Sequence, residues 1–344
     1  MTSKRELGRG ERVLPGLWRL RLPLPWPGVP HGNAWAIAAG SGVVLIDTGY
    51  YEPGSIEQLE RAMSQVNLRI EHVRLLAVTH AHSDHWGQAA PIVERAGCEL
   101  WMHPDHRHAT ETFGDPGAIL ARRLEIGRQS GVPAPVLDRY AERFPKDVPS
   151  GIAKIIEPDR ALIDGVEFET DLGTWRAYET PGHAPSHVCL HQPERRILIS
   201  GDHVLGRISL FYDYGWTPDP AGEFLRSLEV VDRLDARLGL SGHGRPFVDV
   251  RGHIAASREL ATERITAVRA ALAEGPKTAL EIAPSVYQDP LTPQNASWQL
   301  SETLSYLTHL QQLGEAVSER DGDASRWQLT SAANLDTVVS RSVE

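Results

Sequence analysis

Four short segments of the chain carry histidine and aspartate side chains at spacings suited to binding metal ions. The first segment, residues 79–85, reads Thr-His-Ala-His-Ser-Asp-His, and in each of the other three the candidate ligand directly follows a glycine. The seven candidate ligands are His80, His82, Asp84, His85, His183, Asp202 and His243. Nitrogen and oxygen donors without a thiolate suit zinc, manganese, iron or cobalt, and zinc is the usual occupant. The set predicts a site for two divalent metal ions.

The spacing within residues 79–85 indicates how the first four ligands divide between two ions. Side chains two residues apart in extended backbone point the same way, so His80 and His82 can hold one ion. Asp84 and His85 come where the chain turns into the next helix, and they can face a second ion beside the first.

The three later ligands depend on the glycines that precede them. Gly182 and Gly242 are expected to let the backbone turn sharply, which aims His183 and His243 inward. Asp202 offers two carboxylate oxygens and can bridge both ions.

The other histidines receive different interpretations. Four are interpreted as ordinary surface or core residues: His31, His72, His253 and His309. His103 and His203 are expected to support the site without binding metal, and His187 could do either.

The pattern H-x-H-x-D-H with its later histidine, aspartate and histidine resembles that of the metallo-β-lactamase-fold hydrolases, over residues 13–255. The resemblance implies an α/β fold, a four-layer αββα sandwich with the site at one edge. It also implies the ligand sets: the first metal would be bound by His80, His82 and His183, and the second by Asp84, His85 and His243, with Asp202 between them. Asp47 matches the family's aspartate after an early strand, a partner for a ligand histidine, although it could be a simple turn residue.

Departures from other branches of that family narrow the expectation. True β-lactamases usually lack a bridging aspartate, and one class uses a cysteine ligand, whereas Cys98 and Cys189 both lie outside the ligand segments. Flavodiiron oxidases usually have glutamate where His82 stands, and persulfide dioxygenases use only part of the set. The complete set favours a binuclear hydrolase.

Apolar runs and helical periodicity outline the elements that must position these residues. We expect short strands at 17–22 and 35–38 separated by a Pro/Gly-rich break at 23–33, buried strands at 43–46, 73–79 and 98–102, and helices at 55–68 and 86–96. Residues 105–157, rich in proline and with helical patches, are interpreted as a helical insertion that roofs the site. Four further strands follow near 161–169, 174–180, 187–191 and 196–200. Residues 44–49 resemble 197–202, which makes a duplicated two-sheet core plausible.

The C-terminal part of the chain has a different pattern. Helices are expected at 257–274, 278–286 and 297–313, followed by a hairpin over 315–330, an order typical of a winged-helix domain. We therefore divide the chain into a catalytic domain, 1–256, and a winged-helix-like domain, 257–344.

The charge of this C-terminal part argues against nucleic acid. Residues 258–330 hold six Arg and Lys against ten Asp and Glu, and the helix at 297–313 contains no Lys or Arg. Phosphate contact needs cationic side chains, so RNA binding there is disfavoured. The helix carries five leucines expected to pack on the catalytic domain or on a second subunit of a homodimer: Leu300, Leu304, Leu307, Leu310 and Leu313.

Bulk composition agrees with an ordinary globular enzyme. The chain has 344 residues, of which 41% are hydrophobic and 23% charged, with a net charge of −10 that provides no general attraction to nucleic acid or anionic membranes. Two cysteines and no apolar N-terminal or membrane-spanning run suggest a cytoplasmic protein.

These observations predict a metal-dependent hydrolase in which a metal-bridged hydroxide attacks an ester, thioester or lactone carbonyl of a small molecule. Asp84 is the expected proton shuttle, and Tyr212 or Tyr214 could hydrogen-bond a developing oxyanion, although aromatic packing explains them equally well. The alternative is an endoribonuclease or phosphodiesterase of the winged-helix lactamase-like group. A metal-binding module without turnover is disfavoured because both aspartates are present. The sequence leaves open the substrate, the native metal and the subunit count.

Overall fold

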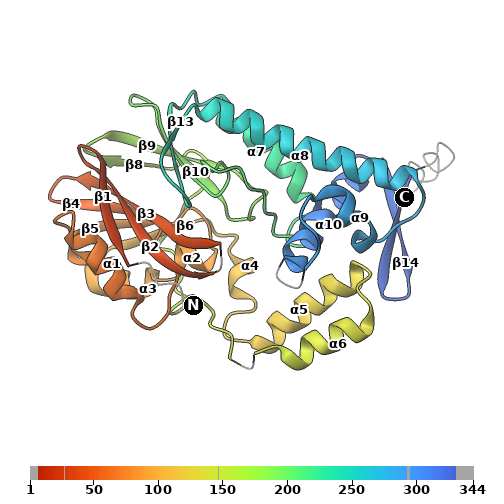
Figure 1. Cartoon of the computed structure of the whole chain (residues 1–344). Helices are drawn as coiled ribbons and strands as arrows, with labels where there is room; N and C mark the ends of the chain where they lie inside the picture. The colour runs from red at the N-terminus through yellow and green to blue at the C-terminus, as the bar shows by residue number, and fades with distance from the viewer. Residues whose placement is uncertain (1–6, 27, 146, 293–294, 331–344) are drawn as a thin grey trace, which may run out of the picture. The chain divides into compact units, whose positions relative to one another are not determined.

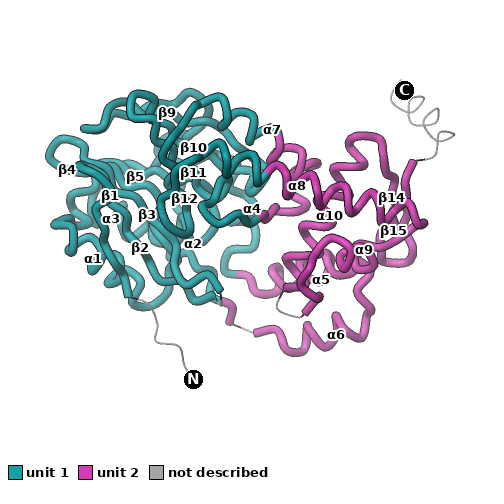
Figure 2. Tube along the Cα trace, turned by 45° about the horizontal axis from the view of Figure 1, so that its top comes forward, with its two compact units in different colours: residues 1–114, 149–209, 226–257 teal, residues 115–148, 210–225, 258–344 magenta. Residues whose placement is uncertain are grey.

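The computed structural model describes residues 7–26, 28–145, 147–292 and 295–330, so the end of the expected C-terminal domain, 331–344, lies outside the described residues (Figure 1). The chain forms two compact units, each built from separate stretches of sequence (Figure 2). Unit 1 comprises residues 1–114, 149–209 and 226–257, and unit 2 comprises 115–148, 210–225 and 258–344.

Unit 1 is built on two β-sheets. The first has seven strands in chain order: β1 (Arg9–Leu14), β2 (Leu17–Trp26), β3 (Val29–Ala39), β4 (Gly42–Ile46), β5 (Val73–Ala77), β6 (Glu99–Met102) and β7 (Arg160–Ala161). The second has six, in the order β13 (Phe247–Val248), β12 (Leu238–Ser241), β11 (Ile197–Gly201), β10 (Val188–Gln192), β9 (Gly173–Glu179) and β8 (Glu167–Thr170). The two sheets confirm the α/β prediction.

Each sheet contains a parallel strand pair at a corresponding place. β4 runs parallel to β5 in the first sheet, and β11 runs parallel to β12 in the second. Of the two segments that resemble each other in sequence, 44–49 is the end of β4 with the loop after it, and 197–202 is the whole of β11 with the residue after it. This correspondence agrees with the duplication that the sequence suggested.

The expected break at residues 23–33 is wrong, because β2 and β3 continue as one long hairpin in which Pro23 pairs with His31 and Trp26 with Val29. β1 covers β2 only from Leu17 to Arg21. On the β1 side, the prolines of β2 beyond that point therefore have no paired strand that would require their missing N–H group.

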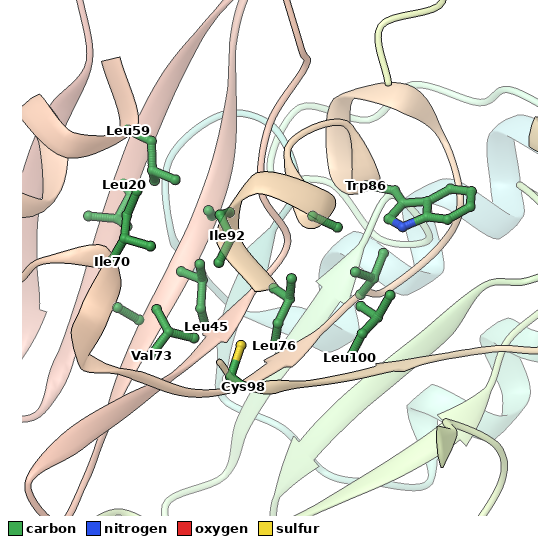
Figure 3. Close-up of a cluster of buried hydrophobic side chains, with 14 of the residues drawn as sticks. Leu20, Leu45, Leu59, Ile70, Val73, Leu76, Trp86, Ile92, Cys98 and Leu100 are labelled. Carbon is green, nitrogen blue, oxygen red and sulfur yellow. The ribbon is translucent and has the colours of Figure 1, made fainter. Parts of the chain in front are cut away.

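Two apolar clusters hold unit 1 together. One fills the space between the sheets, where Trp35 and Ile46 of the first sheet meet Trp175 and Ile199 of the second. The other lies on the opposite face of the first sheet, where Leu20 and Leu45 pack against α1 (Ser55–Ser64) and α3 (Ala89–Ala96), as Figure 3 shows. Helix, sheet and sheet thus form successive layers, joined by burial of apolar surface.

The helix expected at 86–96 is two helices in the structure. α2 (Ser83–Trp86) is a single turn that contains Asp84 and His85, and α3 starts after it. Gly87 separates them at a crowded point, since a Cβ there would lie 2.3 Å from the Gly151 carbonyl oxygen. The short helix fixes the two ligand candidates on rigid backbone.

Unit 2 is mostly helical. Its main elements are α5 (Pro116–Gln129), α6 (Ala134–Arg143), α9 (Ala279–Val286), α10 (Ala296–Gln312) and the hairpin β14 (Ala316–Asp321) and β15 (Ala324–Leu329). Two helices cross from one unit to the other along the chain, α7 (Pro220–Asp232) and α8 (Val250–Ala273). Within unit 2, α10 packs against α5, α9 and β14. Most of the expected insertion at 105–157 thus belongs to the same unit as the C-terminal helices.

The leucines of α10 are largely buried inside unit 2. Leu300, Leu304, Leu307 and Leu310 are at most 3% exposed, whereas Leu313 is 55% exposed. The homodimer expected from these leucines stays a prediction. Over the described part of the chain, no helix combines the length and apolar character needed to cross a bilayer.

A buried carboxylate lies in the middle of unit 2. Glu302 of α10 is fully buried, and its Oε1 accepts hydrogen bonds from Tyr306 and Arg264, whereas its Oε2 has no hydrogen-bond partner among the described residues. Burial raises the pKa of Glu302 from its ordinary value of 4.5 to about 7, although Arg264 and Tyr306 act in the opposite direction.

This raised pKa predicts that the fold loses stability as the pH rises from 4.5 to 7. Between pH 4.5 and 7 the folded chain keeps a proton on Glu302 that the unfolded chain has released, so stability is present at low pH and falls as pH rises. The free energy of unfolding should fall more steeply with pH in the wild type than in Glu302→Gln. The difference between the two slopes should be about 1 kcal/mol per pH unit across this range. Urea unfolding at pH 5, 6 and 7 measures both slopes, with the exposed Glu319→Gln as control; equal slopes for the wild type and Glu302→Gln would contradict the assignment.

Candidate metal centre

The seven candidate ligands come from both sheets of unit 1. Residues 80–85 follow β5 of the first sheet, whereas His183, Asp202 and His243 follow β9, β11 and β12 of the second. The candidate ligands follow the carboxyl ends of these four strands, which is where ligands generally bind in α/β sheets. The site therefore requires the two sheets to pack together.

The first group consists of His80, His82 and His183. His82 Nδ1 lies 3.0 Å from His80 Nε2 and 3.0 Å from His183 Nε2. Three nitrogens bound to zinc at 2.0–2.1 Å in tetrahedral geometry are separated by ~3.3 Å, so this spacing fits one ion.

The second group consists of Asp84, His85 and His243. Asp84 Oδ2 lies 3.2 Å from His243 Nε2 and 3.6 Å from His85 Nε2. The ligand atoms of this group, like those of the first, lie within 4.8 Å of one another, which is close enough for a second ion.

Asp202 lies between the two groups. Its Oδ2 is 3.9 Å from His183 Nε2 and 3.1 Å from His243 Nε2, and its Oδ1 is 3.6 Å from His85 Nε2. The carboxylate thus contacts members of both groups, as a bridging ligand would.

Two buried atoms at the centre show that a cation fits this donor set. His85 Nε2 and Asp202 Oδ1 are buried and have no hydrogen-bond partner in the described structure. Buried polar atoms are rarely left in this state, and a divalent ion between the groups would satisfy both.

The buried carboxylate of Asp47 selects the ring nitrogen that two ligand histidines present to the centre. Its Oδ2 accepts from His85 Nδ1 at 2.8 Å and from Thr79 Oγ1 at 2.9 Å, and Thr79 Oγ1 in turn lies 3.0 Å from His80 Nδ1. With Nδ1 carrying the proton in both rings, Nε2 keeps its lone pair for a metal. Asp47 thus makes the expected hydrogen bond to His85, whereas metal binding by His85 stays a prediction. The φ of 63° places Asp47 in the left-handed region.

His243 is oriented by backbone in the same way. Its Nδ1 lies 3.2 Å from the carbonyl oxygen of His31, which leaves Nε2 toward the two aspartates. The loop that carries His243 is held by Asn33, whose amide donates to the carbonyl oxygens of Ser241 at 2.8 Å and Gly244 at 2.9 Å.

His187 uses both ring nitrogens within the protein. Its Nε2 accepts the backbone N–H of Asp202 at 3.1 Å, and its Nδ1 lies 2.8 Å from Thr180 Oγ1. It therefore positions Asp202 rather than facing the centre. The glycine before Asp202 is required by this contact, because a Cβ at Gly201 would lie 2.5 Å from His187 Nε2.

The two glycines expected to make sharp turns act differently. Gly182 has a φ of 127°, which favours glycine. Gly242 does not have a positive φ; it is needed because a Cβ there would lie 2.2 Å from Asp202 Oδ1 and 2.4 Å from His85 Cε1. Glycine is thus needed at position 242 because the side chains of Asp202 and His85 approach its backbone closely, not because of a sharp turn.

A family model gives the wider context of this geometry. Residues 27–265 match the description "Metallo-beta-lactamase superfamily", a span that covers more than half of the chain and all seven candidate ligands. The chain belongs to the metallo-beta-lactamase superfamily. Proteins of this superfamily bind divalent metals and are hydrolytic, so the expectation of a metal-dependent hydrolase is confirmed at this level.

Proteins similar to this chain occur in fungi and in bacteria. An atrochrysone carboxyl ACP thioesterase of Aspergillus chevalieri is 24% identical over 306 residues, covering 86% of this chain and 80% of the relative. The lactamase-like protein nscB of Neosartorya fischeri is 27% identical, covering 65% of this chain but only 52% of that protein, so the chain spans about half its length. A probable metallo-hydrolase of Bacillus subtilis is 26% identical over 74% of this chain and 82% of the relative.

Two solved structures resemble nearly the whole chain. A metallo-beta-lactamase family protein from Thermus thermophilus has a TM-score of 0.76 and 26% identity, covering 93% of this chain and 100% of that one. A beta-lactamase domain protein from Burkholderia ambifaria has a TM-score of 0.79 and 28% identity, covering 93% and 94%. Both cover far more of the chain than the family model does.

The charges around the superfamily site divide the ligand histidines into two kinds. Burial, reinforced by neighbouring histidines, lowers the pKa of His80 well below its ordinary value. Burial also opposes protonation of His243, but Asp202 and Asp84 raise its pKa to about 10. The His80 ring is thus held neutral, whereas His243 is held protonated by the two carboxylates beside it.

The remaining candidates lie away from the ligand groups or outside unit 1. His103 pairs with Glu179 at 2.8 Å, and burial lowers the pKa of His203 to about 3. Tyr212 and Tyr214 belong to unit 2. Tyr212 is fully buried and its ring packs against Tyr306, whereas the Tyr214 hydroxyl donates to Gln129 at 3.2 Å. Their role as oxyanion donors stays a prediction.

Sequence reasoning missed several residues that support the centre. His31 acts through its backbone carbonyl, and Asn33 through its amide. His108, whose ring lies 5.4 Å from that of His82, pairs with Ser186 Oγ at 2.8 Å. Only His108 could have drawn attention in the sequence, since it is another histidine near the motif.

The double role of Asp47 predicts that Asp47→Asn weakens metal binding. An amide nitrogen cannot accept the hydrogen bonds that His85 Nδ1 and Thr79 Oγ1 donate to Asp47 Oδ2. The tautomers of His85 and His80 that carry the proton on Nδ1 are therefore no longer stabilised. We expect a loss of 10–100-fold in metal affinity, as is typical for such partners. Chelator competition followed by elemental analysis measures it.

The matched control for this experiment is Asp159→Asn, which removes a carboxylate that accepts from the Leu100 backbone at 2.8 Å elsewhere in unit 1. Equal metal affinity in Asp47→Asn and Asp159→Asn would contradict the assignment.

Proposed function

We propose that the protein is a binuclear metallohydrolase that cleaves thioesters, and related ester-type bonds, of small acyl molecules. The observation that carries this proposal is the placement of Asp202, whose two oxygens approach His85, His183 and His243 and so contact both ligand groups. A mononuclear site has no need for a carboxylate in this place.

The choice of thioesters is supported by similar proteins. Two relatives are named atrochrysone carboxyl ACP thioesterase, and a third, from Emericella nidulans, is named thioesterase pkgB. The third is only 48% covered by this chain, and identities of 24–27% leave the acyl group open. The reaction class is therefore better supported than the substrate.

Each proposed ligand has a defined task in this reaction. The first ion would be held by His80, His82 and His183, and the second by Asp84, His85 and His243, with Asp202 shared. Two divalent ions, which we infer to be zinc from the nitrogen and oxygen donors, would lower the pKa of water and polarise a carbonyl oxygen.

Asp84 is the proposed proton carrier. Burial opposes ionisation of Asp84, but His85 and His243 hold its pKa below the ordinary value, so the group is an ionised carboxylate with lone pairs for a proton. It would accept the proton from the attacking water and give it to the leaving thiolate. Tyr212 and Tyr214 remain candidate donors to the developing oxyanion, although the full burial of Tyr212 favours a packing role.

For the C-terminal part we propose a winged-helix-like arrangement that does not bind RNA. Helices α8, α9 and α10 followed by the hairpin β14–β15 have the right order in the chain. The acidic balance of residues 258–330 and the absence of Lys and Arg from α10 support a small-molecule substrate.

A hydrolysis screen of zinc-loaded protein tests the reaction class. We expect turnover of acyl thioesters above that of lactones and aryl esters, and none of phosphodiesters or structured RNA. Cleavage of RNA without any thioester turnover would reverse the proposal.

Metal content tests the binuclear site independently of substrate. We expect about two ions per chain in the wild type, at most one in Asp202→Ala, and a loss of hydrolysis of roughly two orders of magnitude or more in that variant. Asp171→Ala, which removes a carboxylate bound to the Gly40 backbone far from the ligands in sequence, is the control. A fully active wild type with one ion per chain would refute the binuclear assignment.

A further inference from the structure

The first group of candidate ligands depends on two segments of unit 1 that lie side by side. His80 and His82 lie on the segment that follows β5, and His183 lies on the segment that leads into β10. The N–H of Val188 donates to the carbonyl oxygen of Thr79 at 2.8 Å and so joins the two segments. The distance of His183 from the other two ligands therefore depends on how these segments are held together.

A serine side chain makes the next link between the segments. Two residues after Thr79, the N–H of Ala81 donates to Ser186 Oγ at 2.9 Å, and Ser186 lies two residues before Val188. In an antiparallel pair of strands, the backbone carbonyl of the facing residue would accept this N–H group. Here a hydroxyl takes the place of that carbonyl, so the residue type at position 186 decides whether the link exists.

Burial makes this link hard to replace. Ala81 and Ser186 are both 0% exposed, so bulk water does not reach the hydrogen bond between them. A buried N–H group without an acceptor is rare and costs free energy. The same hydroxyl oxygen lies 2.8 Å from Nε2 of His108 in α4 (Arg107–Thr110), a contact that restricts rotation of the hydroxyl group.

The second group of candidate ligands is held by other contacts. The carbonyl oxygen of His85 accepts the N–H of Thr48 at 2.8 Å, and the loop of His243 is held by the Asn33 amide described above. Among the described residues, the hydroxyl of Ser186 makes no hydrogen bond to a member of this group. The link through Ser186 therefore belongs to the first group.

We propose that Ser186 is a positioning residue for the first metal ion alone, because its hydroxyl holds the segment of His80 and His82 against the segment of His183. Loss of the hydroxyl would keep all seven candidate ligands but release the N–H of Ala81, which lies between the two histidines. Groups that orient metal ligands from outside typically change metal affinity by about 10–100-fold. The proposal rests on the two-ion centre proposed above and adds a support that only one of the two ions uses.

Ligand variants that leave one group intact make the two affinities separable. His243→Ala leaves the first group to bind a single zinc ion, and His183→Ala leaves the second group to do so. Adding Ser186→Ala should weaken zinc binding by about 10–100-fold in His243→Ala and by less than about 3-fold in His183→Ala. Competition with a chromophoric chelator measures each affinity. An equal loss in both backgrounds, or no loss in His243→Ala, would overturn the proposal.

A matched pair of variants separates the hydroxyl from the volume of the side chain. Threonine and valine have nearly the same shape, and only threonine carries a hydroxyl. In the His243→Ala background, Ser186→Thr should bind zinc at least about 10-fold more tightly than Ser186→Val, and equal affinities would contradict the proposal. Ser55→Ala, which removes another buried hydroxyl that accepts a backbone N–H in unit 1, should leave both affinities unchanged.

A measurement on metal-free protein separates the link from the proposed reaction. The amide hydrogen of Ala81 should exchange with solvent about 10-fold or more faster in Ser186→Ala than in the wild type, whereas that of Leu100, which donates to Asp159, should keep its rate. Unchanged exchange at Ala81 would refute the link. If the wild type hydrolyses no thioester or binds one ion, the reaction or the two-ion assignment fails, while exchange and zinc affinity still decide the role of Ser186.

Discussion

The hydrogen bonds of one buried carboxylate, Asp47, organise the candidate metal centre. It accepts from the ring of His85 directly and reaches the ring of His80 through the hydroxyl of Thr79, so a single group sets the tautomer of one ligand in each metal group. The other ligands depend on equally specific partners, His187 for Asp202 and the carbonyl of His31 for His243. Without these hydrogen-bond acceptors, the histidine rings could turn a protonated nitrogen toward the centre. The partners of the candidate ligands therefore matter as much as the ligands themselves.

Each metal group draws ligands from both sheets, and this couples the centre to the packing of the fold. His80 and His82 follow the first sheet and His183 follows the second; Asp84 and His85 follow the first and His243 the second. Neither sheet alone holds a complete group. The apolar layer between the sheets, which contains Trp35 and Trp175, therefore holds the two parts of the centre together as well as stabilising unit 1. Arg19 adds a further link between the sheets, because it lies on the first sheet and donates to the loop that follows β12 of the second.

Apolar runs and periodicity were sufficient for the α/β class and most helices, because those features have local signatures. The grouping of the candidate ligands came from the resemblance to a known family, and the structure brings the ligand atoms of each group within 4.8 Å of one another. Sequence reasoning failed where the cause is not local. The hairpin continues through Pro23 beyond the last residue of β2 that pairs with β1, and the sequence of residues 23–33 does not reveal where that neighbouring strand ends. Gly242 is needed because Asp202 and His85 approach its backbone, not because of its own φ. His31 accepts from the ring of His243 through its backbone carbonyl oxygen, and the Asn33 side chain donates to the carbonyl oxygen of Gly244. Both contacts join segments about 210 residues apart, and the sequence does not reveal such long-range contacts.

Unit 2 is assembled from three stretches of chain that alternate with those of unit 1. Within it, α10 packs against α5, which comes from the middle of the sequence, and against α9 and β14, which come from its end. Gene truncation after α8 would therefore not remove a module cleanly, because it would take away α10 and leave the apolar side of α5 without its cover. The insertion after residue 114 and the C-terminal helices are thus one packed unit, although they lie far apart in the sequence.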